Sequence, residues 1–225
     1  MTVRTSRPSP TPQLVDTGVV AILRAASGDR FVDVAATLAG AGVTCLEVTL
    51  TTAGALDAVR AVRDRLPDAV SVGVGTVTSV ADVHAAVDAG AEFLVSPGVS
   101  MDVVTAGLAR GVPSYPGAWT ATEVLTAWRA GASAVKLFPA ATGGPAHLRH
   151  LRGPLPDVPL VPTGGVALDD IAAYVQAGAV AVGLGGPLQG DAAEGGSLDA
   201  LADRAARALA AVRAARSEGG AGGAG

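Results

Sequence analysis

Two ionisable residues stand inside apolar runs that would otherwise be ordinary buried strands. Lys136 interrupts SAVKLFP (133–139), and Glu47 interrupts CLEVTL (45–50). An uncharged lysine amine attacks a ketone to form a carbinolamine and then an iminium, which draws electrons from a nearby carbon–carbon bond. A carboxyl group beside it can carry the protons that these steps move. The two residues therefore predict Schiff-base chemistry on a ketone.

The use of cationic residues singles out the same lysine. The chain has 16 cationic residues, of which 15 are arginine and one is Lys136. Arginine cannot replace lysine where a neutral amine must attack a carbonyl, because the guanidinium group stays protonated. The alternative is chance, since one lysine can survive anywhere in an arginine-biased sequence. Its position inside a strand favours the catalytic interpretation.

Side-chain alternation places both residues on one face of their strands. Glu47 shares a face with residues 45 and 49, and Lys136 shares one with residues 134 and 138. If both faces point into one barrel, the two groups approach each other. The alternative is a buried structural ion pair, which contributes little to stability because desolvation offsets the attraction. Arg24, at the end of the first strand, is a candidate for binding a substrate carboxylate, and its alternative is a surface ion pair.

Eight strand-like runs alternate with alanine-rich helical stretches and position these residues. The strands are expected at 19–23, 45–50, 70–76, 92–97, 112–117, 133–139, 159–165 and 179–186, and the helices at 31–39, 54–66, 79–89, 101–110, 121–130, 145–152, 168–177 and 197–215. Glycine recurs between a helix and the next strand, where it ends helices in the left-handed conformation. Eight such units predict a single-domain (β/α)₈ barrel.

Composition and length bound the other possibilities. We expect a disordered or short helical lead-in at 1–16, the barrel at 17–215, and a disordered glycine- and alanine-rich tail at 216–225. A net charge of -4 and 3% aromatic residues argue against a nucleic-acid partner. No apolar stretch reaches the length of a membrane span, and the N-terminus lacks the apolar core of a signal peptide. The single cysteine, Cys45, fits a reducing cytoplasm.

Glycine pairs end the last two strands. TGG (163–165) and GLGG (183–186) fall where the loops of such barrels commonly bind phosphate through backbone N–H groups. A metal site is not expected, because the three histidines, His84, His147 and His150, form no ligand cluster. No dinucleotide-binding or P-loop motif is present.

Several motifs together resemble the family of 2-keto-3-deoxy-6-phosphogluconate (KDPG) and 4-hydroxy-2-oxoglutarate (KHG) aldolases, which includes the phosphogalactonate aldolases. They are GVTCLEVTLTT (42–52), GVGTV (73–77), SPG (96–98), GASAVKLFPAATGG (131–144), PTGG (162–165) and GLGG (183–186). The resemblance covers about residues 17 to 213. It implies a (β/α)₈ barrel, usually a homotrimer, that needs no metal or organic cofactor and cleaves a small 2-keto acid to pyruvate and an aldehyde.

The resemblance also implies a role for each matched position. Lys136 matches the Schiff-base lysine and Glu47 the acid/base. Thr76 and Pro97 match residues around the pyruvyl group. The remaining matches form a phosphate site: Thr163, Gly164, Gly165, Gly185 and Gly186.

Two departures affect the expected substrate. Position 51 is Thr where the family usually has a substrate-binding arginine, and Arg24 resembles an arginine of the phosphogalactonate branch that takes over this role. Pro187 stands where a serine is common, and it offers neither a hydroxyl nor a backbone N–H. The first expectation is cleavage of a 2-keto-3-deoxy-6-phospho sugar acid to pyruvate and glyceraldehyde 3-phosphate.

Three alternatives stay open. One is cleavage of 4-hydroxy-2-oxoglutarate to pyruvate and glyoxylate. Another is a barrel isomerase or a metal-dependent decarboxylase, although the decarboxylase is disfavoured by the apolar neighbours of Lys136. The last is a non-catalytic anion-binding or assembly barrel, which the retention of both Glu47 and Lys136 disfavours.

Overall fold

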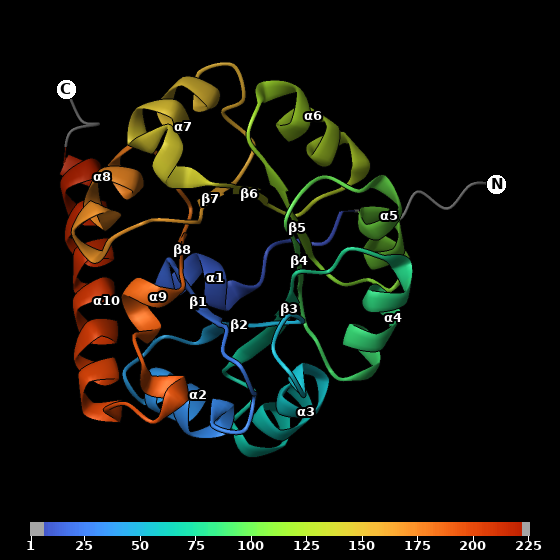
Figure 1. Cartoon of the computed structure of the whole chain (residues 1–225). Helices are drawn as coiled ribbons and strands as arrows, with labels where there is room; N and C mark the ends of the chain where they lie inside the picture. The colour runs from blue at the N-terminus through green and yellow to red at the C-terminus, as the bar shows by residue number, and fades with distance from the viewer. Residues whose placement is uncertain (1–6, 222–225) are drawn as a thin grey trace.

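The apolar runs between glycine-containing turns form eight parallel strands in the computed structural model, which describes residues 7–221 (Figure 1). Each strand falls inside its predicted range, except that β5 ends one residue beyond it, and several strands are two to five residues shorter than predicted. The strands are β1 (Val19–Leu23), β2 (Cys45–Thr49), β3 (Ser71–Gly75), β4 (Leu94–Ser96), β5 (Ser114–Ala118), β6 (Val135–Leu137), β7 (Leu160–Pro162) and β8 (Val182–Leu184). The predicted (β/α)₈ fold is therefore confirmed.

Helices surround the sheet as an outer layer (Figure 1). They are α2 (Phe31–Gly40), α3 (Ala55–Arg65), α4 (Val80–Asp88), α5 (Met101–Ala109), α6 (Ala121–Ala130), α7 (Gly144–Arg152), α8 (Ile171–Gln176) and α10 (Leu198–Ala221). The glycines that follow five of them all have positive φ, as predicted: Gly42, Gly90, Gly111, Gly131 and Gly178. None of the helices between residues 7 and 221 is both long and apolar enough to cross a membrane.

The strands follow chain order around the barrel, and the seam lies between β7 and β8. The sheet runs β7-β6-β5-β4-β3-β2-β1-β8, and a parallel bridge between Thr163 and Gly183 joins its two ends. A Cβ atom at position 183 would overlap the Thr163 side chain. The closing contact therefore requires a residue without a side chain at this position.

Strand alternation separates the apolar residues into two layers. Leu46 and Val48 of β2 point outward and pack in the large core between the sheet and the helices. Cys45 of β2 and Ala134, the residue before β6, belong to a smaller cluster inside the barrel. Glu47 and Lys136, two residues further along the same strands, therefore also face the barrel interior, as the sequence predicted.

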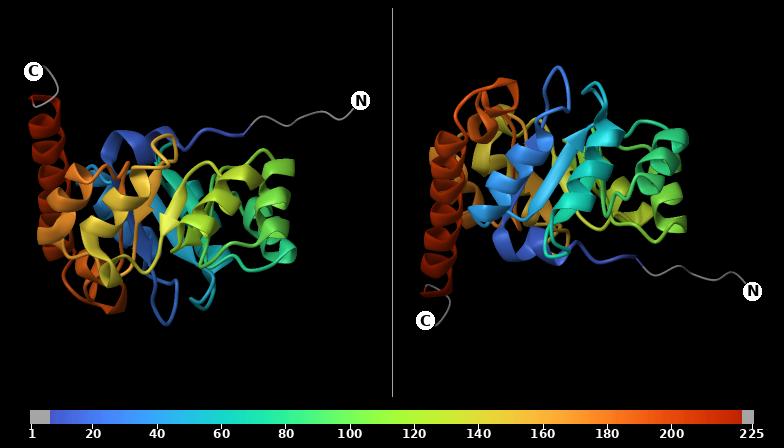
Figure 2. Two further views of the ribbon diagram at one scale, coloured as in Figure 1. Left: turned by 90° about the horizontal axis from the view of Figure 1, so that it is seen from above. Right: turned by 90° about the horizontal axis from the view of Figure 1, so that it is seen from below.

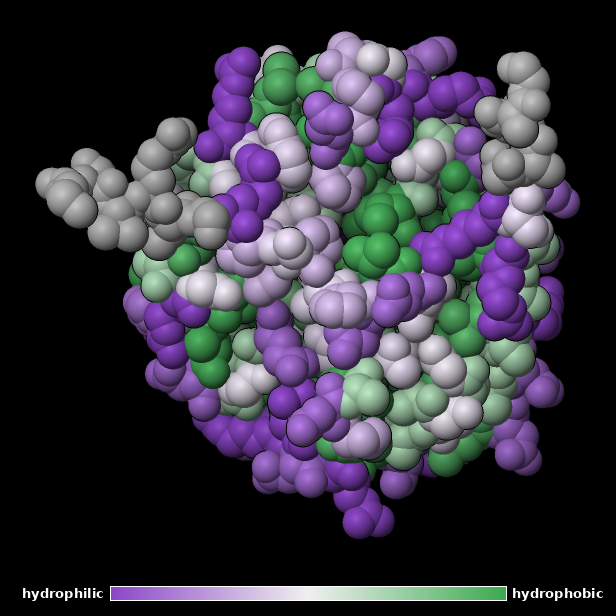
Figure 3. Space-filling model, turned by 180° about the vertical axis from the view of Figure 1, so that it is seen from behind, coloured by the Kyte–Doolittle hydropathy of each residue, from purple (hydrophilic) through white to green (hydrophobic). Residues whose placement is uncertain are grey.

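A short helix, α1 (Pro12–Thr17), closes the N-terminal end of the barrel. Its Leu14 is fully buried among the interior side chains, and the Thr11 N–H donates a hydrogen bond of 2.9 Å to Tyr115 Oη. In both side views, α1 lies at the opposite end of the strands from the loop that follows β1 (Figure 2). From behind, this closed end carries scattered apolar patches among hydrophilic side chains (Figure 3). The interior is accessible from the other end, where the strands terminate.

The ends of the chain differ in part from the prediction. The lead-in contains α1 from Pro12, while residues 1–6 lie outside the described residues. The sequence predicts disorder from residue 216, whereas α10 continues to Ala221, because a long helix is already formed and each added residue supplies one further hydrogen bond. Residues 222–225 lie outside the described part. The predicted eighth strand also ends early, at Leu184, and Gly186 begins a further helix, α9 (Gly186–Gln189).

Replacing Gly183 by alanine should weaken the seam. The added methyl group meets the short, buried Thr163 side chain, and overpacking of this kind costs about 1–3 kcal/mol of unfolding free energy. Urea denaturation followed by circular dichroism measures the change. The control is Gly40→Ala at the end of α2, where an added Cβ meets nothing within 4 Å and the helix gains propensity. Equal midpoints for the two variants would contradict this account of the seam.

Candidate active site

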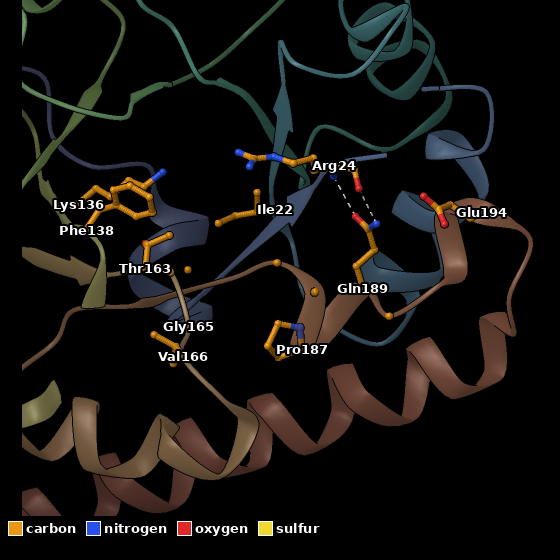
Figure 4. A pocket seen from close by; sticks show the side chains of 15 residues that line it. Ile22, Arg24, Lys136, Phe138, Thr163, Gly165, Val166, Pro187, Gln189 and Glu194 are labelled. Carbon is orange, nitrogen blue, oxygen red and sulfur yellow. Dashed lines mark hydrogen bonds between the residues drawn. The ribbon is translucent and has the colours of Figure 1, made fainter. Parts of the chain in front are cut away.

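A cavity of about 400 Å³ opens at the C-terminal ends of β1, β6, β7 and β8 (Figure 4). Seven of the ten predicted site residues line it. They are Arg24, Lys136, Thr163, Gly164, Gly165, Gly185 and Gly186. The other three predicted residues, Glu47, Thr76 and Pro97, do not line this cavity. Residues far apart in the sequence therefore meet in one concave site.

Lys136 sits in the middle of β6 and points into the cavity. Its side chain is largely buried, with 8% relative exposure, and its Nζ lies 5.1 Å from the centre of the Phe138 ring. No ion pair of Lys136 within 4.0 Å is found among residues 7–221. The structural Lys136–Glu47 pair considered as an alternative is therefore not formed, and the amine stands against an aromatic surface.

Glu47 lies on the opposite wall, in the middle of β2. It is 2% exposed, and its Oε1 has no hydrogen-bond partner. A Cβ atom at Gly75 on the neighbouring strand would overlap this carboxyl, so the space it occupies exists because residue 75 is glycine. Burial raises the pKa of the Glu47 carboxyl, and the positive charges of Lys136 and Arg24 oppose that shift. The group is thus suited to hold a proton in the barrel interior.

Arg24 follows the last residue of β1 and extends over Ile22 towards Lys136 (Figure 4). Its guanidinium group takes part in none of the ion pairs within residues 7–221, so the surface ion pair considered as an alternative is not found. The arginine brings an uncompensated positive charge to the side of the cavity that faces the lysine. An anionic group bound between them would meet both charges.

Backbone rather than side chains forms the wall between β7 and β8. Gly164 and Gly165 have φ angles of 89° and 75°, and a Cβ atom on either would crowd Phe138 or Ala141. Consecutive residues of this kind turn backbone N–H groups towards an anion. Gly186 begins α9 across the cavity, but Pro187 follows it and supplies no N–H.

Thr76 and Pro97 occupy neighbouring strand ends outside this cavity. Thr76 follows β3 with a φ of 63°, the single positive φ of a non-glycine residue within residues 7–221. Such strained residues are concentrated at functional sites. Pro97 follows β4, and its carbonyl abuts Gly117, which is the register partner of Lys136. Both residues are at the correct end of the barrel, but their proposed contact with a pyruvyl group stays a prediction.

The cavity residues that the sequence analysis did not select include Gln189, Phe138 and Glu194. Gln189, at the end of α9, is 7% exposed and hydrogen-bonds the main chain of Arg24. Phe138 forms the apolar wall beside Lys136, and Glu194 lines the outer part of the cavity. Phe138 lies within the motif at 131–144 but received no role, whereas the sequence around Gln189 and Glu194 carries no catalytic motif. The one local signal for Gln189 is a polar residue in a short segment between two glycines, Gly186 and Gly190.

Thr51, which replaces the family's usual arginine, makes a local contact. Its hydroxyl donates a hydrogen bond of 3.2 Å to Thr49 Oγ1. Residues 7–221 contain no group of three or more histidine, cysteine, aspartate or glutamate side chains that could hold an ion. His147 is half-buried and stacks on Trp119.

Comparison with known proteins gives a consistent result. The family model for KDPG and KHG aldolase matches residues 12–201. The 2-dehydro-3-deoxy-phosphogluconate aldolase of Pseudomonas aeruginosa is 42% identical over 151 residues, 65% of this chain and 68% of the relative. The 2-dehydro-3-deoxy-6-phosphogalactonate aldolase of Escherichia coli K12 is 31% identical over 189 residues, 84% of this chain and 91% of the relative.

A solved structure adds a chemical clue. It is that of KDPG aldolase from Legionella pneumophila, with pyruvate captured at low pH as a covalent carbinolamine intermediate. This chain matches it with a TM-score of 0.80 and 28% identity, over 88% of this chain and 97% of that one.

The raised pKa of Glu47 predicts a measurable pH dependence of stability. The folded state binds the proton of Glu47 more tightly than the unfolded state does. The free energy of unfolding therefore falls as pH rises from the ordinary carboxyl range, about 4, through the raised pKa of the folded protein. Glu47→Gln removes this loss. Thermal denaturation should show the variant to be more stable than the parent at high pH, with the difference shrinking in acid.

The control for that experiment is Asp68→Asn, which removes the same charge from an exposed position. Its stability should track that of the parent at every pH. If the Glu47→Gln advantage is the same at acidic and alkaline pH, the carboxyl does not titrate in the way that its burial implies.

Proposed function

The chain belongs to the KDPG and KHG aldolase family, and from this premise we propose that Lys136 is its Schiff-base nucleophile and Glu47 its proton carrier. The protein is a class I, pyruvate-dependent carbon–carbon lyase. We propose that its substrate is a 2-keto-3-deoxy-6-phospho sugar acid. The observation that carries the assignment is the placement of the chain's single lysine inside the cavity, free of any carboxylate partner among residues 7–221.

The reaction begins at the lysine amine. Nζ of Lys136 attacks the C2 carbonyl of the substrate, and the oxygen takes up a proton to give a carbinolamine. Loss of water then gives an iminium. The C4 hydroxyl loses its proton, the C3–C4 bond breaks, and its electron pair passes to the iminium, which becomes an enamine as the aldehyde forms. Protonation of C3 and addition of water release pyruvate and restore the amine.

Glu47 fits the proton transfers. Burial favours its protonated form, so it can donate a proton to the carbinolamine oxygen and recover one from the C4 hydroxyl, directly or through a water molecule. The neighbouring positive charges favour the carboxylate once the proton has left. Glu47 can therefore alternate between its protonated and ionised forms during the cycle.

The substrate is held at its two ends. Arg24 binds the carboxylate next to the keto group, since its charge is unpaired and it points towards Lys136. The backbone around Gly164, Gly165 and Gly186 binds the phosphate, together with the Thr163 hydroxyl. Thr76 and Pro97 complete the surroundings of the pyruvyl group from β3 and β4.

A second substrate is favoured by one observation. Pro187 has no backbone N–H and no hydroxyl, so the anion-binding wall offers fewer hydrogen-bond donors to a phosphate group. The alternative is cleavage of 4-hydroxy-2-oxoglutarate to pyruvate and glyoxylate, which uses the same lysine and needs no phosphate site.

We further propose that the protein is a cytoplasmic homotrimer. Its single cysteine, Cys45, is a buried free thiol, which suits a reducing compartment. Val80 and Met101, at the starts of the adjacent helices α4 and α5, expose 39% and 47% of their surface, and this is where we place the contact between subunits, since contiguous exposed apolar surface marks interaction sites.

Borohydride trapping with pyruvate tests the central proposal. Incubation with pyruvate and borohydride should add one reduced pyruvyl group, and peptide mass mapping should locate it at Lys136. The readout is clean because the chain offers no other lysine amine. Lys136→Arg keeps the charge but cannot form the iminium, so both labelling and activity should disappear. A folded parent protein that takes no label, or takes it at the N-terminus alone, would exclude the Schiff-base mechanism.

Restoring donors at position 187 tests the phosphate site. Pro187→Ser adds an N–H and a hydroxyl and should lower KM for the phosphorylated substrate by about tenfold, the effect of one or two hydrogen bonds to a charged group. Pro187→Ala adds the N–H alone and should fall between parent and serine variant. Cleavage of 4-hydroxy-2-oxoglutarate, measured in parallel, serves as the control. An equal change for both substrates would show that position 187 does not face a phosphate.

A further inference from the structure

Gln189 binds both polar groups of the Arg24 main chain. Its Nε2 donates a hydrogen bond of 2.8 Å to Arg24 O, and its Oε1 accepts one of 3.0 Å from the Arg24 N–H (Figure 4). β1 ends at Leu23, so Arg24 is the first residue beyond the strand. The glutamine amide thus pairs with Arg24 as the main chain of a neighbouring strand would. The hydrogen-bonded part of β1 is in effect one residue longer.

This pairing fixes the start of the arginine side chain. A main chain held on both its N–H and its C=O has a defined Cα–Cβ direction, and from that point Arg24 extends over Ile22 towards Lys136 (Figure 4). Without the glutamine, Arg24 would begin the loop that leads to α2, with no partner of this kind on either side. The direction of the guanidinium group therefore depends on a residue 165 positions away.

Gln189 is itself held from outside the cavity. Arg204 of α10 donates to two carbonyl oxygens at the end of α9, from Nε to Leu188 O at 2.7 Å and from Nη2 to Gln189 O at 2.9 Å. The glutamine is 7% exposed, so its two bonds compete little with water. A continuous set of hydrogen bonds therefore runs from the outer helix layer through α9 to Arg24.

We propose that Gln189 is a positioning residue for the substrate carboxylate, acting through Arg24. The inference rests on the proposed function, because it requires Arg24 to bind the carboxylate of a 2-keto acid. α9 begins at the anion-binding wall with Gly186 and ends at Gln189. One short helix thus sets the positions of the groups that bind both ends of the substrate.

A pyruvate titration by borohydride trapping tests the role. Gln189→Met keeps the length and the apolar packing of the side chain but removes both hydrogen bonds, and Gln189→Glu keeps the acceptor but removes the donor. Each should raise the pyruvate concentration for half-maximal labelling of Lys136, by about tenfold for methionine. Labelling at saturating pyruvate should stay complete. The matched control is Gln176→Ala on α8, whose exposed amide bonds Glu218 away from the cavity.

Combination with Arg24→Ala separates positioning from general stabilisation. Arg24→Ala alone should raise the half-maximal concentration, and Arg24→Ala with Gln189→Met should raise it no further, because the glutamine acts through the arginine. A second increase in the double variant, or parent-like titration of both Gln189 variants, overturns the inference. Absence of labelling in the folded parent instead refutes the proposed function, and a parent-like Arg24→Ala variant refutes the role of Arg24.

Discussion

Space inside a small barrel is the constraint on which this site depends. Side chains from eight strands converge on one axis, so a carboxyl group and an amine can reach the interior from opposite walls only where the facing positions are empty. Gly75 leaves the room that the Glu47 carboxyl fills, and Gly183 admits the Thr163 side chain at the seam between β7 and β8. Glycine therefore serves two purposes here: one glycine lets the barrel close, and the other leaves room for the carboxyl group of the site.

Positive charge predominates at the inner end of the cavity. Arg24 and Lys136 bring positive charge there, burial favours the protonated form of Glu47 on the opposite barrel wall, and the acidic Glu194 lines only the outer part. No ion pair among residues 7–221 compensates either cation. An internal pair would have reduced this imbalance and lowered the affinity for an anion. The unbalanced cavity is instead complementary to a substrate that carries a carboxylate beside its keto group.

The sequence was informative where residue type conflicted with its surroundings. Lys136 and Glu47 stood out because an ionisable side chain in a buried strand has no local explanation, and strand alternation then gave their direction. The alanine-rich stretches indicated the helices, and the glycines after them marked where the helices end, so the eight repeats could be located. Gln189 was missed because its partner is distant in the chain, and no local pattern encodes such a contact. The extent of α10 was missed because the glycines near its end have poor helix propensity, whereas the helix that precedes them carries the hydrogen-bond pattern further.

Helix α1 closes one end of the barrel, and this affects the order in which the two products leave. With Leu14 buried in the floor of the barrel, the interior is a well whose described opening is at the other end. The lysine lies on the inner wall, and the glycine-rich loops lie nearer the rim. Under the proposed mechanism, cleavage leaves the aldehyde between the opening and the three-carbon fragment bound to the lysine. The products then leave in a fixed order, the aldehyde first and pyruvate after hydrolysis, and an aldehyde that re-enters before hydrolysis meets the enamine and can re-form the substrate.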